Sequence, residues 1–69
     1  MKNPIIYENG DKIWYNSNGD FHRDDGPAIE LYSGGKQWYI DGQRHREDGP
    51  AAEWSGGSKA WYIKGKCIT

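Results

Sequence analysis

A motif of seven residues occurs twice in this chain, and it constrains the fold more than any other feature of the sequence. The segment from His22 to Ala28 reads His-Arg-Asp-Asp-Gly-Pro-Ala, and its copy lies 23 residues later with Glu47 in place of Asp24. Two residues after each copy comes an acid, followed by a glycine-rich stretch and then Lys-x-Trp-Tyr-Ile. Self-similarity at a fixed period is typical of repeat proteins.

A third, degenerate copy precedes these two. Lys12 begins the sequence Lys-Ile-Trp-Tyr, Pro4 lies 23 residues before Pro27, and Asn9-Gly10 stands where the later copies have paired glycines. We therefore expect one domain over residues 1–69. Its three units are predicted at about 4–19, 27–42 and 50–65, joined by His-Arg-x-Asp-Gly loops.

Each unit is predicted to be a β-hairpin. The paired glycines Gly34-Gly35 and Gly56-Gly57 are expected to supply the positive φ angles of tight turns, and Asn-Gly is a strong hairpin signal. The flanking segments are rich in Trp, Tyr and Ile, and no long window shows the apolar period of a helix. The predicted fold class is all-β: an antiparallel meander of about six short strands from three repeated hairpins, without a substantial helix.

The aromatic residues are expected to form the core. Only 35% of the residues are hydrophobic while 14% are aromatic, so either almost every one of the four Trp side chains is buried, or the protein gains stability by self-association or by binding a partner. Alternation along the second strand of the middle unit puts Lys36, Trp38 and Ile40 on one face, opposite Gln37 and Tyr39. In a twisted sheet the repeated indole rings are expected to stack as a ladder. The rings of this ladder are Trp14, Trp38 and Trp61.

A meander leaves two unpaired edges, here expected near residues 4–8 and 59–64. Pro4, Lys59 and Lys64 are interpreted as guards against open-ended pairing. Because no obvious capping unit is present, the edges also favour a homodimer formed by strand-edge pairing.

The charge balance argues against several classes of partner. Nine Lys and Arg oppose ten Asp and Glu, so the formal net charge is -1. Nucleic acids and anionic membranes are bound by a basic face, which this composition does not provide. The sequence has no apolar run of the roughly 18 residues that a membrane span needs, no apolar signal segment near Met1, and one cysteine, Cys67. A reducing, cytoplasmic location is the simplest expectation.

The two histidines invite a metal-site or nuclease interpretation, since each lies beside an arginine and acids. Equivalent residues in successive units lie two strands, or about 10 Å, apart, which is too far for a shared zinc ion. We expect instead a structural loop whose arginine pairs with the following Glu30 or Glu53, or with the loop acids. The residues assigned to this structural motif are His22, Arg23, Gly26, Pro27, His45, Arg46, Gly49 and Pro50, with Trp14, Trp38 and Trp61. No catalytic residue, metal ligand or cofactor is predicted.

Two sets of side chains are candidates for a partner-binding surface. One is the row of tyrosines opposite the indole rings, because tyrosine offers contact area and a hydroxyl at low entropic cost. The other is the acids of the two loops, which would meet a basic surface. These candidates are Tyr15, Tyr39, Tyr62, Asp24, Asp25, Glu47 and Asp48. Trp54 in place of Leu31, and Phe21 in place of Arg44, depart from the repeat and mark positions where function could have been added.

The His-Arg-x-Asp-Gly-Pro-Ala segment followed by Gly-Gly-x-Lys-x-Trp-Tyr resembles the short repeats of bacterial, phage and large-virus proteins, which are similar to MORN-type repeats. The resemblance covers roughly residues 4–66. It implies a stack of hairpins used for protein or lipid contact, and a variant group is labelled antitoxin-like. Gly and Tyr stand at other places here than in the MORN pattern, so lipid binding carries over only weakly, and no catalytic residue carries over.

The favoured hypothesis is a small non-enzymatic protein-binding module whose partner is another protein. Such a chain can act by steric blockade, as phage-encoded inhibitors of host defence do, anti-CRISPR proteins among them, and would then work in the bacterial host cytoplasm. The alternatives are an antitoxin-like repeat protein and a glycan or nucleic-acid binder that uses the aromatic ladder. A minimal hydrolase or nuclease using His22 and His45 is the last.

Overall fold

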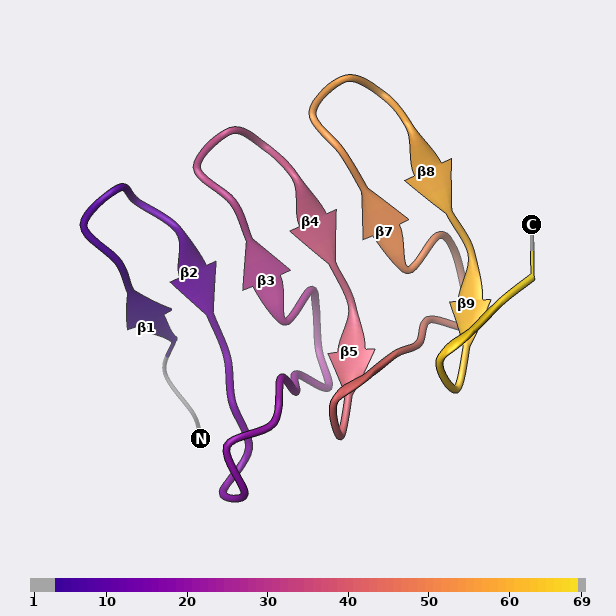
Figure 1. The fold of residues 1–69 in the computed structure, drawn as a ribbon, viewed down its shortest axis with the longest axis horizontal. Coiled ribbons are helices and arrows are strands. Elements are labelled where there is room, and N and C mark those ends of the chain that lie inside the picture. The colour runs from indigo at the N-terminus through magenta and orange to yellow at the C-terminus, as the bar shows by residue number, and fades with distance from the viewer. Residues whose placement is uncertain (1–3, 69) are drawn as a thin grey trace.

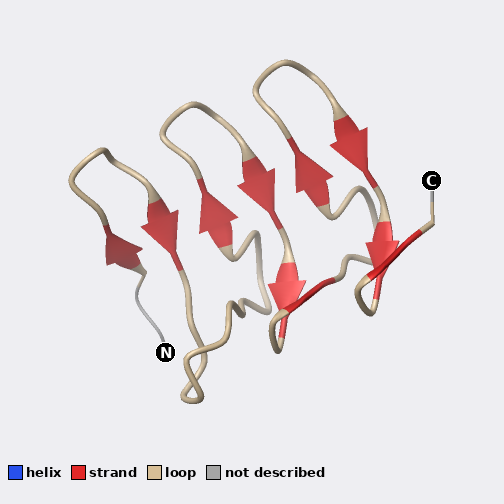
Figure 2. Cartoon of the chain, in the orientation of Figure 1, coloured by secondary structure: helices blue, strands red, loops and turns tan. Residues whose placement is uncertain are grey.

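The computed structural model describes residues 4–68, and all the regular structure in them is β-strand (Figure 2). Ten strands of two residues each occur in it. In chain order they are β1 (Ile5–Ile6), β2 (Lys12–Ile13), β3 (Ile29–Glu30), β4 (Lys36–Gln37), β5 (Tyr39–Ile40), β6 (Gln43–Arg44), β7 (Ala52–Glu53), β8 (Lys59–Ala60), β9 (Tyr62–Ile63) and β10 (Lys66–Cys67).

Six of these strands form one antiparallel sheet in the order β1-β2-β3-β4-β7-β8. Figure 1 shows the three hairpins side by side, with the two ends of the chain at opposite ends of the row. The predicted all-β meander of three hairpins is confirmed. The outermost strands are β1 and β8, so the open edges also lie where the sequence placed them.

A second, smaller hairpin follows each of the last two sheet hairpins. β5 pairs with β6 and β9 with β10 in separate two-stranded sheets. Their turns are Asp41-Gly42 and Lys64-Gly65, with φ of 49° and 83° in the first and 49° and 84° in the second. The prediction of one continuous strand through Trp38 is therefore wrong. The Trp38 N–H still donates to Ala51, directly before β7 of the main sheet, but the Trp38 carbonyl accepts the His45 N–H, so the chain changes sheet at the tryptophan.

Only one glycine in each sheet hairpin adopts the positive φ angle that was predicted for both glycines of a pair. One glycine in each sheet hairpin has a positive φ: Gly10 at 97°, Gly34 at 105° and Gly57 at 96°. Gly35 and Gly56 do not have a positive φ. Gly34 therefore corresponds to Gly57, and matching the pair Gly34-Gly35 with the pair Gly56-Gly57 was wrong by one residue. Gly35 is needed for space, since a Cβ there would lie 3.0 Å from the Leu31 side chain.

The first unit is also shifted by one residue from the predicted alignment. Ile6 pairs with Lys12 as Glu30 pairs with Lys36. Counting back along both strands, Pro4 takes the place of Ala28 and not that of Pro27. The spacing of the two prolines was therefore a coincidence.

Few side chains are fully buried, because the sheet is thin. The molecule measures 32 × 27 × 15 Å along its principal axes. The buried apolar residues among 4–68 are Ala28, Ile29, Ala51 and Ala52. Trp54 is 39% exposed and Trp61 36% exposed, so the first of the two expected sources of stability, burial of almost every tryptophan, is not found. A single layer has no opposing layer to cover large rings on both sides.

Candidate functional site

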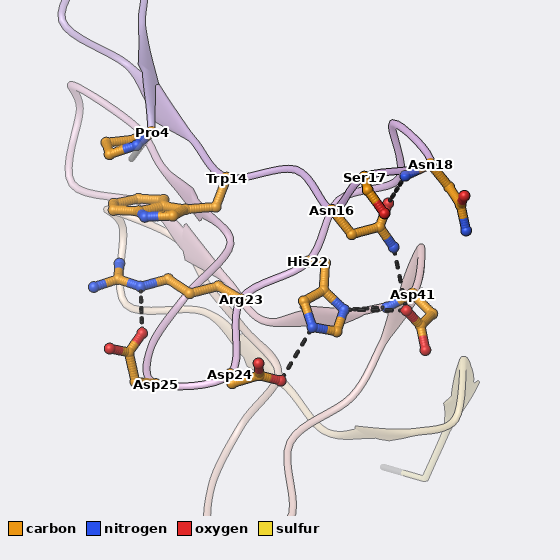
Figure 3. Close-up of a pocket in the computed structure, with 10 residues that line it drawn as sticks. All are labelled: Pro4, Trp14, Asn16, Ser17, Asn18, His22, Arg23, Asp24, Asp25 and Asp41. Atoms are coloured by element: carbon orange, nitrogen blue, oxygen red, sulfur yellow. Dashed lines mark hydrogen bonds and ion pairs between the residues drawn. The ribbon is translucent and has the colours of Figure 1, made fainter. Parts of the chain in front are cut away.

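The arginine of each repeated loop stacks on a tryptophan of the unit before it. The Arg23 Cζ atom lies 3.8 Å from the centre of the Trp14 ring, and Arg46 Cζ lies 3.9 Å from the Trp38 ring. Figure 3 shows the Trp14 indole between Arg23 on one face and Pro4 on the other. Among residues 4–68 no two indoles stack, so the predicted tryptophan ladder is wrong: a guanidinium covers each of these two rings.

Hydrogen bonds within the loop hold this guanidinium in place. Arg46 Nε donates to the Asp48 carboxylate at 2.9 Å, and Nη1 donates to the Pro50 carbonyl at 3.1 Å and to the Glu53 carboxylate at 3.4 Å. The first loop repeats the same three bonds at 3.0, 3.2 and 3.1 Å. The predicted arginine pairing is confirmed, and both candidate sets of acids take part at once.

The glycine of the motif provides the room that this arrangement needs. A Cβ at Gly49 would lie 3.0 Å from Arg46 Cζ, and a Cβ at Gly26 would lie equally close to Arg23 Cζ. Glycine therefore allows the close approach of the guanidinium, which would have to move by a few tenths of an ångström to admit a Cβ, and its φ is not positive.

The histidine of each loop binds the turn of the next small hairpin. His45 Nδ1 accepts the Lys64 N–H at 2.9 Å, and His22 Nδ1 accepts the Asp41 N–H at the same distance. Because Nδ1 accepts, the neutral ring carries its proton on Nε2, which faces Glu47 at 3.4 Å in one loop and Asp24 at 3.0 Å in the other. In the first unit the Asp41 carboxylate also lies 3.2 Å from His22 Nδ1.

Two open hollows line the loop side of the molecule. The one drawn in Figure 3 is bordered by Trp14, His22 and the residues around them, and its repeat equivalent is bordered by Trp38 and His45. The four predicted acids are between 82% and 86% exposed, and the first two border both hollows while the last two border only the second. Those acids are Asp24, Asp25, Glu47 and Asp48. Among the described residues no group of three or more His, Cys, Asp or Glu is placed to hold a metal ion.

The tyrosines predicted to face a partner form a row and are partly buried. The Tyr15 and Phe21 ring centres lie 5.6 Å apart, and Phe21 and Tyr39 lie 5.1 Å apart. Further along, the Arg44 guanidinium lies 5.8 Å from the Tyr39 ring and 5.2 Å from the Tyr62 ring. Phe21 does occupy the position of Arg44, since Tyr15 bridges Phe21 as Tyr39 pairs with Arg44. Phe21 thus completes the row where an arginine does so later.

Polar contacts hold this row of aromatic rings at one end and at its centre. The hydroxyl of Tyr7 lies 3.0 Å from that of Tyr15, and this hydrogen bond is the main reason that the pKa of Tyr15 is raised above 10.0. At the centre, Gln37 Oε1 accepts from Arg44 Nη2 at 2.9 Å and from the Tyr39 hydroxyl at 3.3 Å. The roles of Gln37 and Arg44 were not predicted from the sequence, although the Asp41-Gly42 turn before β6, the strand of Arg44, was a hairpin signal.

The large apolar side chains that remain exposed lie mainly toward the ends of the row of hairpins. Tyr32 is the most exposed, at 78%, and it sits at a hairpin tip near Gly10. The set comprises Ile5, Ile6, Tyr7, Tyr32, Trp54, Trp61 and Ile68.

No protein-family model, no curated protein and no solved structure matches the chain. In residues 4–68 we find no helix with the length and apolar character to cross a membrane.

Proposed function

We propose that this chain is a non-enzymatic protein-binding module. The supporting observation is that the polar side chains of the repeated loops make contacts within the molecule, whereas large apolar side chains remain exposed. The groups that resemble catalysts are taken up in joining one unit to the next: both histidines accept backbone N–H groups, and both loop arginines are stacked and hydrogen-bonded. What the surface offers instead is apolar and aromatic area at the sheet edges and hairpin tips.

The same contacts weigh against a glycan or nucleic-acid platform built on the repeated tryptophans. A base or sugar needs a free ring face to stack on. Arg23 covers one face of Trp14 and Arg46 one face of Trp38, so among residues 4–68 Trp61 is the one member of the three without an arginine over its ring, and the three rings offer no continuous row of free faces. A thin plate with exposed apolar ends is better suited to occupying a protein surface, which is how a steric inhibitor acts.

Affinity capture from the cells that make this protein tests the proposal. The tagged chain is expected to retain one protein at close to equal stoichiometry. At least one of the variants Ile6→Ser, Tyr32→Ser and Trp61→Ser should weaken that capture more than tenfold, while Asn18→Ala, in an exposed polar loop, should leave it unchanged. Absence of a stoichiometric protein, or a hydrolytic activity that His45→Ala abolishes in a folded chain, would contradict the proposal.

A further inference from the structure

The third unit presents a surface whose two counterparts are both covered inside the molecule. Trp61 stands where Trp14 and Trp38 stand, and the Ile68 N–H donates to the Trp61 carbonyl at 2.8 Å as the His45 N–H donates to the Trp38 carbonyl at 3.1 Å. Yet no guanidinium covers Trp61 in the described part of the chain, and the residue is 36% exposed. The third unit thus has the same surface, but within residues 4–68 no arginine and no further strand lie on it.

The two internal interfaces show what such a cover consists of. Each covering segment places an arginine on the indole, then runs through Gly and Pro, and pairs as a strand with the exposed edge: β3 with β2, and β7 with β4. The tryptophan N–H donates to the alanine carbonyl of that segment, at 2.8 Å for Trp14 to Ala28 and 2.7 Å for Trp38 to Ala51. In the strand register a lysine of the edge lies opposite the glutamate of the segment, as Lys36 lies opposite Glu53.

Each element that receives these contacts is present and unused in the third unit. β8 is one of the two open edges of the six-stranded sheet, and the one next to Trp61. Lys59 occupies on β8 the position that Lys36 occupies on β4, since Lys59 lies opposite Glu53 as Lys36 lies opposite Glu30. The Trp61 N–H has no acceptor within residues 4–68.

From these matches we infer that β8 and Trp61 form a binding site for an extended protein segment with the chemistry Arg-x-Asp-Gly-Pro-Ala-x-Glu. The inference rests on the proposed protein-binding function and names the partner chemistry of one surface. The segment adds as a strand to β8, its alanine carbonyl accepts the Trp61 N–H, its glutamate pairs with Lys59, and its arginine lies on the indole. The open edge β1 of a second copy is a poorer occupant. Ile6 would stand there in the place of Glu53, so Lys59 would lie opposite an apolar side chain.

A synthetic peptide with the sequence of residues 46–53, blocked at both ends, tests the site on the whole chain. Titration followed by nuclear magnetic resonance should give saturable shifts of the Trp61 indole and backbone N–H signals, and of Lys59, with the Trp14 and Trp38 indole signals unchanged. Replacing the peptide's arginine by glutamine should weaken binding roughly tenfold. The Trp61→Ala variant should lose binding, and Ile6→Ala, at the opposite edge, should keep it.

No shift at millimolar peptide, or shifts centred on β1, would overturn the inference. So would concentration-dependent shifts at β8 without peptide together with a dimeric mass, since a second copy would then be the occupant. A chain that repeats residues 46–68 after Ile68 gives an independent reading. The Trp61 indole should become as protected from solvent as that of Trp38, and continued exposure would contradict the inference. If the peptide fails while a partner is still captured, the protein-binding function stands and only the chemistry assigned to β8 is wrong.

Discussion

Trp38 and Trp61 occupy the same place in successive units, yet their surroundings differ. Both follow a sheet strand and precede a small hairpin, and both are flanked by Tyr-Ile. Trp38 lies under Arg46 with a strand added beside it, whereas Trp61 has neither. The local sequence thus builds the hairpin, and the loop that follows decides whether an arginine covers the indole.

The largest expected effect on stability comes from replacing each of these two tryptophans by leucine. Trp38→Leu should destabilise the chain by roughly 2 to 3 kcal/mol, since it removes packed surface and the arginine contact together. Trp61→Leu should cost less than about 1 kcal/mol because its ring is partly in solvent already. Urea unfolding followed by circular dichroism measures both, and equal losses would contradict the comparison.

A pair of glycine substitutions sharpens the role of the loop. Gly49→Ala should cost about 1 to 2 kcal/mol, because the new methyl group would displace the Arg46 guanidinium from Trp38. Gly56→Ala is the matched control: its Cβ would meet nothing within 4 Å, and its φ is not positive. We expect a change within about 0.5 kcal/mol there by urea unfolding. A Gly49→Ala chain as stable as the control would show that the guanidinium is not confined.

Replacing the loop histidine separates its acceptor role from its bulk. His45→Ala should destabilise by about 1 kcal/mol, since the Lys64 N–H loses its acceptor at a positive-φ residue. His45→Asn places a carbonyl oxygen close to the position of Nδ1 and should recover part of this loss. Thermal unfolding of the two variants decides the matter, and identical melting temperatures would argue against the hydrogen bond as the cause.

The smallest expected effect concerns the tyrosine row at the far end of the molecule. Tyr7→Phe removes the hydrogen bond that raises the pKa of Tyr15, so this pKa should fall toward 10.0. Because the folded state holds the proton more tightly, this bond adds stability below the unfolded pKa, and the gain is lost as the pH rises through the folded one. An ultraviolet titration of tyrosinate checks the shift, with Tyr32→Phe as the control. An unchanged Tyr15 titration would contradict the assignment.

The sequence was sufficient for the fold class because turns and strands are local. The repeat, the Asn-Gly and Gly-rich turns and the Trp-Tyr-Ile segments predicted three hairpins, and the sheet has them in that order. The second hairpins were missed although Asp41-Gly42 was visible, because the Trp-Tyr-Ile run was interpreted as one strand.

The burial of the tryptophans could not be predicted in the same way. Alternation gives the face on which a side chain lies, but not which group from another unit covers it. The sequence showed that each loop arginine had acids to pair with. Only the arrangement of the units reveals that Arg46, once paired, lies flat on Trp38.

A double-mutant cycle between Trp38 and Arg46 tests the central claim most directly, namely that the loop arginine joins successive units by stacking on the tryptophan. Unfolding free energies of Trp38→Leu, Arg46→Gln and the double variant give the coupling energy. The account predicts coupling of about 1 kcal/mol for this pair and none for Trp61 with Arg46. Additive losses at Trp38 and Arg46, with coupling near zero, would contradict it.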